Sequence, residues 1–279
     1  MRWSLMMATL GATYLAPRGF KRAFAPPRPP VGQGPSDLGL PEQVVWLESS
    51  TGTRLHSWFV PVDFSAPGVV VIHGWGSNSS LMLPLATHLS EAGFHGLFLD
   101  VRNHGLSEHD DFVSMPRFAE DLDVAIDWLR LQPRVQSVGV IGHSVGGAAA
   151  ILSASRNAQI EALVAVSAFA DPRDVMQRQL SRLPKAVVRV ILAAVQRSIG
   201  LKFEEFAPYS RIALIESPVL LVHGDQDDVV PIENLHRLAS GLPAAEVLLV
   251  PGGGHSDLAP YEPFVGEIIN FLARSLAAV

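Results

Sequence analysis

The chain has no cysteine among its 279 residues. Disulfide bonds, thiolate metal sites and a cysteine nucleophile are therefore excluded, although a secreted enzyme can also lack cysteine. Charged residues make up only 17% of the sequence, and the formal net charge is −6. Acidic and basic residues are mixed along the chain with no basic stripe, so nothing favours nucleic-acid binding.

The amino-terminal end lacks a full-length apolar span. Leu5 to Ala16 is mostly apolar but has only about a dozen residues, fewer than the ~20 that cross a bilayer. We favour a membrane anchor for residues 1–24, because basic residues flank the apolar stretch at Arg2, Arg18, Lys21 and Arg22. A helix packed on the domain is the next interpretation. A signal peptide cleaved near Ala23-Phe24-Ala25 is the least favoured, since basic residues separate that site from the apolar stretch. The expected localisation is accordingly membrane-associated, then cytoplasmic, then secreted.

Residues 25–37 are rich in proline, which predicts a stiff linker, and residues 38–279 are long enough for one domain with a sizeable core. Short apolar stretches alternate with helical patterns in this domain. That alternation predicts an α/β fold with a mainly parallel sheet flanked by helices. The expected strands are 43–48, 54–60, 69–72, 96–99, 137–141, 162–166, 219–222 and 246–250, and the expected helices are 79–92, 115–131, 147–152, 232–240 and 261–276.

One section breaks the alternation. Asp171 to Tyr209 has no strand pattern, and its residues 187–195 would form a helix that is apolar around much of its circumference. A helix this apolar must be covered. Because loops at the carboxyl ends of parallel strands form the binding sites of such sheets, we expect residues 171–209 to form a small helical cap over a cleft.

The pentapeptide Gly142-His143-Ser144-Val145-Gly146 matches the pattern Gly-x-Ser-x-Gly. An apolar strand precedes it and a run of small residues with helical character follows it. Strand, sharp turn and helix are the setting in which this pattern becomes a nucleophile elbow. The sequence therefore predicts that Ser144 is a catalytic nucleophile.

A serine hydroxyl needs a base, and the base needs an orienting acid. His255 follows the strand 246–250 and three glycines, which makes it the best candidate base. The acid is expected in the turn after the strand 219–222, where Asp225, Asp227 and Asp228 all remain candidates on position alone.

The attacked carbonyl also needs donors for its developing negative charge. The main-chain N–H of Val145, directly after the nucleophile, is one expected donor. The loop after the strand 69–72 should supply the other, through the N–H of Trp75. The Trp75 indole is a candidate wall of the substrate pocket. His143 is a second candidate substrate-binding residue, with its ring expected to point away from the Ser144 hydroxyl.

These motifs, in this order, resemble the α/β-hydrolase superfamily over about residues 43–276, and in particular its serine esterase and peptidase-S9-like branch. The acid is the fourth residue of the family's Gly-x-x-Asp-x-x-Val-Pro pattern, which implies Asp227 in Gly224–Pro231. The stretch Asp100–Ser107 looks like the family's Asp-x-Arg-Gly-His-Gly-x-Ser loop, which supports the site. Asn103 stands where that loop usually has glycine.

The sequence thus predicts a serine hydrolase that cleaves small-molecule carboxylic esters with short to medium acyl groups through an acyl-enzyme. Neither a metal nor an organic cofactor is expected; a solvated loop is the favoured interpretation of the acidic and histidine-rich residues 104–111. Thioesterase, acyltransferase and serine peptidase activities use the same triad, and a non-catalytic binding protein is the alternative outside enzymes. The oligomeric state cannot be read from the sequence.

Overall fold

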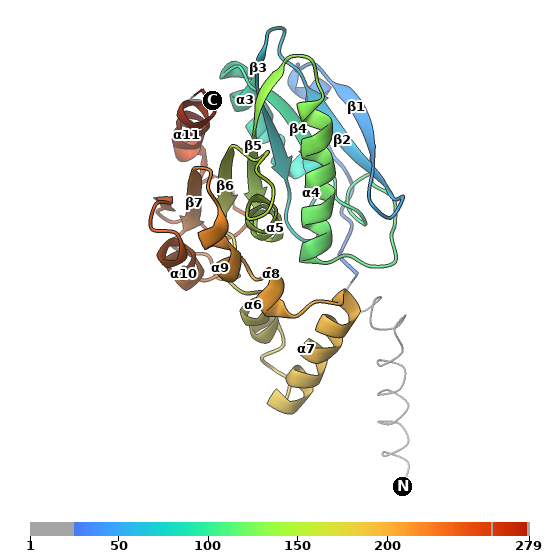
Figure 1. The fold of residues 1–279 in the computed structure, drawn as a ribbon, viewed down its shortest axis with the longest axis vertical. Coiled ribbons are helices and arrows are strands. Elements are labelled where there is room, and N and C mark those ends of the chain that lie inside the picture. Colours follow the sequence, from blue (N-terminus) through green and yellow to red (C-terminus); the bar gives the residue numbers. More distant parts are fainter. Residues whose placement is uncertain (1–24, 258, 278–279) are drawn as a thin grey trace.

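The computed structural model describes residues 25–257 and 259–277, so the expectations for residues 1–24 lie outside the described chain (Figure 1). An eight-stranded sheet runs through the molecule in the order β1-β2-β4-β3-β5-β6-β7-β8. Only β1 and β2 run antiparallel to their neighbours; the other strands are parallel. The strands are β1 (Gln43–Glu48), β2 (Arg54–Val60), β3 (Ala66–Ile72), β4 (His95–Leu99), β5 (Val135–His143), β6 (Ala162–Val166), β7 (Val219–Gly224) and β8 (Glu246–Val250).

Helices cover both faces of this sheet, as the alternation of apolar strands and helical patterns predicts. The helices α4 (Met115–Arg130), α5 (Val145–Ala154) and α10 (Glu233–Gly241) pack on one face, and α3 (Pro84–Glu91) and α11 (Val265–Leu276) pack on the other. The central strands are apolar on both sides for this reason. In β3, Val70 and Ile72 face the core under α4, whereas Val69 and Val71 face the core under α3 and α11.

Two expected helices are each shorter than predicted and begin with a separate turn. The stretch 79–92 forms a 3₁₀ turn, Ser79–Met82, followed by α3, which begins at Pro84. Proline lacks an N–H and is tolerated in the first turn of a helix but not in its interior, so Pro84 marks a start. Residues 261–276 likewise form a 3₁₀ turn, Glu262–Phe264, before α11.

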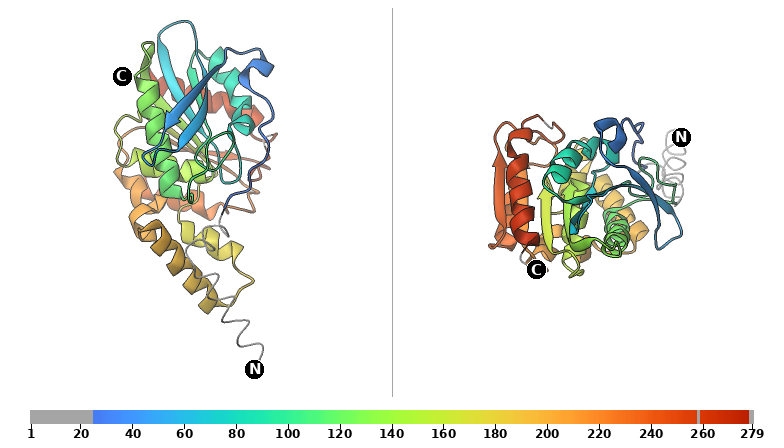
Figure 2. Two further views of the ribbon diagram at one scale, coloured as in Figure 1. Left: turned by 90° about the vertical axis from the view of Figure 1, so that its right-hand side faces the viewer. Right: turned by 90° about the horizontal axis from the view of Figure 1, so that it is seen from above.

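The section between β6 and β7 contains short helices joined by loops and no strand, as expected. It contains α6 (Pro172–Gln179), α7 (Lys185–Ile199), α8 (Phe203–Phe206) and α9 (Pro208–Arg211), and residues 171–209 are called the helical insert below. In the left view of Figure 2, α6 and α7 lie below the sheet. The insert meets the body through Val188, Leu192 and Val195 of α7, which lie on one face of that helix and are buried in the core on the α4 side.

The proline-rich stretch is fixed to the domain rather than free of it. Arg28 donates through Nε to the carbonyl of Gly105 at 2.8 Å and through Nη2 to the carbonyl of Ser107. Asn78 donates to the carbonyls of Pro29 and Pro30. Residues 25–34 therefore lie across the loops that follow β3 and β4. Within residues 25–257 and 259–277, none of the helices is long and apolar enough to span a bilayer.

Candidate active site

Ser144 stands in the turn between β5 and α5, in a backbone conformation that L residues rarely adopt. Its φ is 53° and its ψ is −117°. Two main-chain hydrogen bonds hold this conformation: Ser144 N–H donates to Val166 at 2.8 Å, and the Ser144 carbonyl accepts from Ala148 at 2.9 Å. Such strain persists only where the surroundings over-determine it, and it holds Ser144 at the carboxyl edge of the sheet.

At both glycines of the pentapeptide, another part of the backbone lies so close that a side chain would not fit. A Cβ on Gly142 would lie 2.5 Å from the carbonyl oxygen of Gly146. A Cβ on Gly146 would lie 2.5 Å from the carbonyl oxygen of His73. Any side chain at either position would therefore push α5 away from the sheet and move Ser144.

The structure brings the three predicted catalytic side chains together. His255 Nε2 lies 3.0 Å from Ser144 Oγ, and His255 Nδ1 lies 2.8 Å from Asp227 Oδ2. The other carboxylate oxygen of Asp227 accepts the main-chain N–H groups of Val229 at 3.0 Å and Val230 at 2.7 Å. This arrangement fixes the carboxylate and gives the imidazole an acceptor at Nδ1, so Nε2 is left free to accept the serine proton.

Electrostatics keep the Asp227 carboxylate ionised. Burial favours the neutral acid, but the hydrogen bonds from His255 and Val230 and the nearby imidazoles outweigh it, and the pKa of Asp227 is lowered. Asp225 instead accepts the N–H of Gly252 at 2.7 Å from an exposed position, and Asp228 is exposed. Of the three candidate acids, Asp227 is the one that the structure brings to His255.

The loop after β3 lies directly against Ser144. A Cβ on Gly74 would lie 3.1 Å from the Ser144 Cβ, so glycine permits this approach. Val145 is the first residue of α5, and its N–H has no acceptor within the helix. Among residues 25–257 and 259–277, the Trp75 N–H also has no hydrogen-bond acceptor. Val145 thus follows the serine in the chain, and Trp75 follows the glycine that lies against the serine, as the prediction of these two oxyanion donors requires.

Two buried histidines hold this loop. His104 accepts the N–H of Gly76 through Nε2 at 3.1 Å and donates through Nδ1 to the carbonyl of Arg102 at 2.9 Å. Burial lowers the pKa of His104 to about 3, with the neighbouring His73 as a smaller cause. His73 donates through Nδ1 to the carbonyl of Gly74, and burial lowers its pKa as well. Both rings are neutral, and their hydrogen bonds hold the loop after β3 in place.

His143 has a contact that sequence reasoning did not predict. Its Nε2 donates to the main-chain carbonyl of His255 at 2.8 Å. Burial lowers the pKa of His143 to about 4, with the proximity of His255 as the next cause, so the ring is neutral. His143 also lines a cavity beside Ser144, which keeps its predicted role in substrate binding open.

Tyr261 is a second contact that the sequence did not reveal. Its hydroxyl donates to the carbonyl of Gly254 at 3.0 Å and lies 3.2 Å from Ser167 Oγ. It thereby holds the residue before His255. A lone tyrosine at the start of a helix gives no sequence signal for this role.

The loop after β4 supports the site as the family resemblance implies. The Asp100 carboxylate is buried and accepts the N–H groups of Ser79 at 2.7 Å and Leu106 at 2.9 Å. Asn103 adopts a positive φ of 64°, which explains how it replaces glycine: asparagine tolerates the left-handed region. Its side-chain oxygen accepts the N–H of Asp110 at 2.8 Å.

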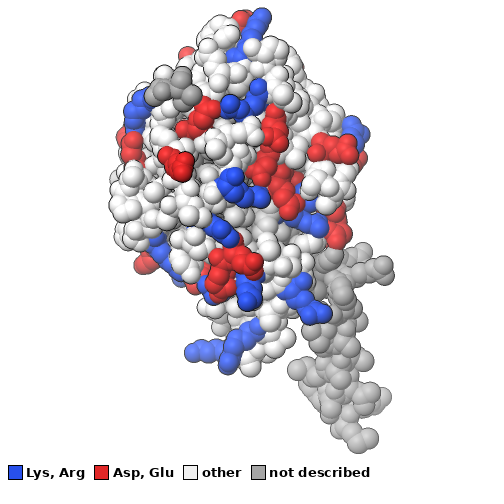
Figure 3. Space-filling model, in the orientation of Figure 1, with Lys and Arg blue, Asp and Glu red and all other residues white. Residues whose placement is uncertain are grey.

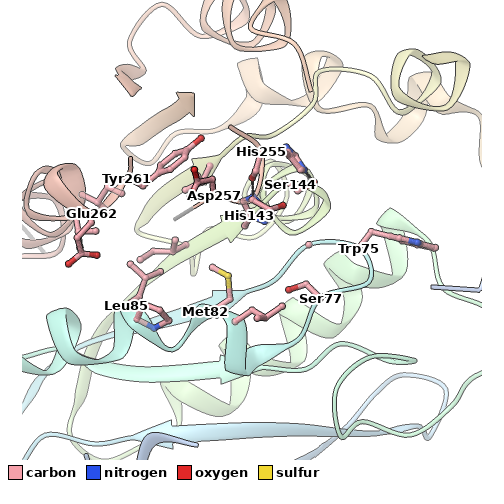
Figure 4. A pocket seen from close by; sticks show the side chains of 18 of the residues that line it. Trp75, Ser77, Met82, Leu85, His143, Ser144, His255, Asp257, Tyr261 and Glu262 are labelled. Carbon is pink, nitrogen blue, oxygen red and sulfur yellow. Dashed lines mark hydrogen bonds between the residues drawn. The ribbon is translucent and has the colours of Figure 1, made fainter. Parts of the chain in front are cut away.

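Two cavities meet at Ser144, and Trp75 and His255 line both. One has a volume of about 330 Å³ between the sheet, α3 and α11, and Figure 4 shows Met82, Leu85 and Tyr261 around it. The other has a volume of about 520 Å³ and lies under the helical insert, with a mostly apolar lining that includes Met176, Val195, Ile199, Phe203 and Phe206. In the described residues, no group of three or more His, Asp, Glu or Cys side chains could hold a metal ion.

Comparison with known proteins gives the family. A sequence family described as serine aminopeptidase, S33, matches residues 66–205, and a family described as TAP-like protein matches residues 200–275. An uncharacterized protein of Mycobacterium tuberculosis is 30% identical over 239 residues, which cover 84% of this chain and 79% of that protein. The pimeloyl-[acyl-carrier protein] methyl ester esterase of Xanthomonas campestris is 25% identical over 258 residues, 76% of this chain and 96% of the esterase.

Solved structures agree on the fold. An esterase of Pyrococcus furiosus superposes with a TM-score of 0.74 at 22% identity, covering 90% of this chain and 97% of the esterase. At this identity, the likeness establishes the arrangement of sheet and helices. The activity must be argued from the site.

Proposed function

Because this chain belongs to the α/β-hydrolase superfamily, we propose that it is a serine esterase that cleaves carboxylic esters through an acyl-enzyme intermediate. The observation that carries the proposal is the hydrogen-bonded series from Ser144 Oγ through the His255 ring to Asp227 Oδ2, at 3.0 and 2.8 Å. The serine of this series, Ser144, lines both cavities.

The geometry supports a defined sequence of steps. His255 Nε2 takes the proton of Ser144 as the hydroxyl oxygen attacks the ester carbonyl. Asp227 holds the imidazole in place and offsets its positive charge. The N–H groups of Val145 and Trp75 stabilise the oxyanion, and His255 returns the proton to the leaving alcohol. Water, deprotonated by His255, then attacks the acyl-enzyme and releases the acid.

The linings of the cavities support an apolar substrate of small size. Both linings are mostly apolar, and the volumes of about 330 and 520 Å³ lie in the range of small-molecule sites. Since Ser144 borders both cavities, the acyl group can occupy one and the alcohol the other. The Xanthomonas and Pyrococcus proteins are both named esterases, which favours an ester as the substrate. We therefore propose short to medium acyl groups as the substrates.

A series of nitrophenyl esters from acetate to palmitate tests this proposal. The expected result is a maximum of kcat/KM at a short or intermediate chain, and loss of turnover in Ser144→Ala. A maximum at palmitate would overturn the assignment of acyl length. An absence of turnover across the whole series would overturn the esterase proposal.

Peptidase activity is the second candidate. The matching family is described as a serine aminopeptidase, and the smaller cavity is also lined by Asp257 and Glu262. A carboxylate near the scissile bond could bind the free amino group of a peptide. Aminoacyl nitroanilides test this directly: turnover of these above turnover of the esters would replace the esterase proposal. Thioesterase and acyltransferase activities would use the same triad and are tested with acyl thioesters and added alcohols.

A further inference from the structure

The helical insert carries a surface that the proposed chemistry does not use. Residues 175–203 contain six basic residues and no acidic residue, in a chain whose net charge is −6. All six side chains are exposed, and within the described residues none pairs with a carboxylate. They are Arg178, Arg182, Lys185, Arg189, Arg197 and Lys202.

Exposed apolar side chains lie between these basic residues. The inner face of α7 is buried through Val188, Leu192 and Val195, but its outer face exposes Val187 by 44% and Val190 by 58%. Leu183 and Leu201, at the two ends of α7, are also exposed. In Figure 3 the lowest part of the coloured surface, where α7 lies in Figure 1, shows basic and uncharged side chains and no acidic ones.

The inner side of the same helix lines the larger cavity. Val195, Ser198 and Ile199 of α7 line that cavity, and so does Ala25. Residues 1–24, which precede Ala25 in the sequence, include the apolar stretch Leu5–Ala16 with basic residues on both sides.

We propose that the outer face of α7 docks on an anionic lipid surface. Valine and leucine side chains would enter the interface, while lysine and arginine extend to the headgroups. Anionic headgroups supply the opposite charge that these six residues do not find among the described residues. The proposal concerns where the enzyme works and is independent of the ester chemistry.

The chemistry of this face disfavours other occupants. A symmetric dimer would bring the same basic residues of two copies together, with like-charge repulsion. Nucleic acid would match the charge but would leave Val187 and Val190 against phosphates and water. A lipid interface accommodates both the charge and the apolar side chains.

Vesicle sedimentation of the full chain tests the proposal. We expect binding to phosphatidylcholine vesicles that contain phosphatidylglycerol and much weaker binding to phosphatidylcholine alone. Each basic residue near an anionic surface is worth about fivefold in the partition coefficient. The triple variant Arg182→Glu, Lys185→Glu, Arg189→Glu should therefore lose roughly a hundredfold or more, and Val187→Asp with Val190→Asp should lose binding as well.

Matched controls lie at other places on the molecule. Leu131 is 80% exposed at the end of α4 remote from the insert, so Leu131→Asp adds a charge to an exposed apolar site there. Arg134→Glu reverses an exposed basic residue outside the insert that, in the part of the chain that the structure describes, donates to the carbonyl of Asp63 and pairs with no carboxylate. Both should bind vesicles like the unmodified chain. All variants should hydrolyse a soluble acetate ester at the unmodified rate, which shows that they fold.

Three outcomes would overturn the proposal. The insert variants could bind as tightly as the unmodified chain, which would place any membrane contact elsewhere. The unmodified chain could fail to bind anionic vesicles. The variants could instead change the mass of the assembly in light scattering while vesicle binding persists, which would assign the face to a second copy. Failure of soluble-ester turnover with vesicle binding intact would contradict the proposed function and leave this inference standing.

Discussion

The ring of His143 donates a hydrogen bond through Nε2 to the main-chain carbonyl of His255, at 2.8 Å. The residue that precedes the candidate nucleophile thus supports the backbone of the candidate base. The neutral state of His143, whose pKa burial lowers to about 4, keeps a second positive charge away from His255. This contact couples the turn after β5 to the loop after β8.

We expect His143→Ala to lower kcat by about five- to tenfold, because one hydrogen bond that positions His255 is lost. KM for a small ester should change little. His143→Gln keeps an N–H donor and should recover part of the rate. Steady-state kinetics with an acetate ester separate the two constants. Equal losses in both variants would mean that the ring acts through packing and not through its N–H group.

Asp227→Asn should lower kcat by roughly three to four orders of magnitude while thermal unfolding stays similar, because an amide cannot stabilise the imidazolium. Asp225→Asn is the matched control in the same turn. Its carboxylate contacts Gly252 and not His255, so turnover should be nearly unchanged. The assignment of the acid is wrong if the control loses the activity instead.

Gly146→Ala should destabilise the fold by about 3 kcal/mol or more, since its Cβ would lie 2.5 Å from the His73 carbonyl oxygen. Gly266 is the matched control in α11, where an added Cβ meets nothing within 4 Å. Gly266→Ala should be neutral or stabilise the protein by up to about 1 kcal/mol. Urea unfolding measures both. A mild effect at Gly146 would contradict the close approach of α5 to β3.

The free energy of unfolding should fall as the pH drops from 7 to 5. The pKa of His104 is about 3 in the folded chain and about 6.5 when unfolded, so below pH 6.5 protons bind the unfolded state first. His104 alone lowers the free energy of unfolding by about 2 kcal/mol at pH 5. Burial lowers the pKa of His73 as well, so His73 acts in the same direction. Above pH 6.5 both states are neutral and His104 contributes no pH dependence.

Urea unfolding of the unmodified chain and of His104→Asn, at pH 7 and at pH 5, measures this effect. The variant should show a decrease between the two pH values that is smaller by about 2 kcal/mol. The same decrease in both proteins would mean that His104 is not held neutral by burial.

Much of the fold and of the candidate site follows from the sequence. Uninterrupted apolar strands that alternate with helical patterns determine a sheet covered on both faces. Gly142 and Gly146 mark the tight turn, and chain order selects His255. The strand, helix and turn signals are local, since each depends on residues within one strand–turn–helix unit, whereas the choice of His255 depends on its position after Ser144 in the chain order.

The supporting contacts could not be predicted in the same way. The bond from His143 to the His255 carbonyl and the bond from Tyr261 to Gly254 depend on how distant loops meet. The attachment of Arg28 to the loop after β4 likewise joins residues 77 and 79 positions apart in the sequence. The proline content predicts a stiff linker there, but it carries no information about the loops on which this segment docks.

Fluorophosphonate labelling followed by intact-mass and peptide mass spectrometry tests the central claim most directly. A fluorophosphonate reacts with an activated serine and forms a stable adduct. The account predicts one adduct per chain, located on Ser144, and no adduct in Ser144→Ala or after unfolding. An unlabelled native chain, or equal labelling of Ser144→Ala, would contradict the assignment of Ser144 as the nucleophile.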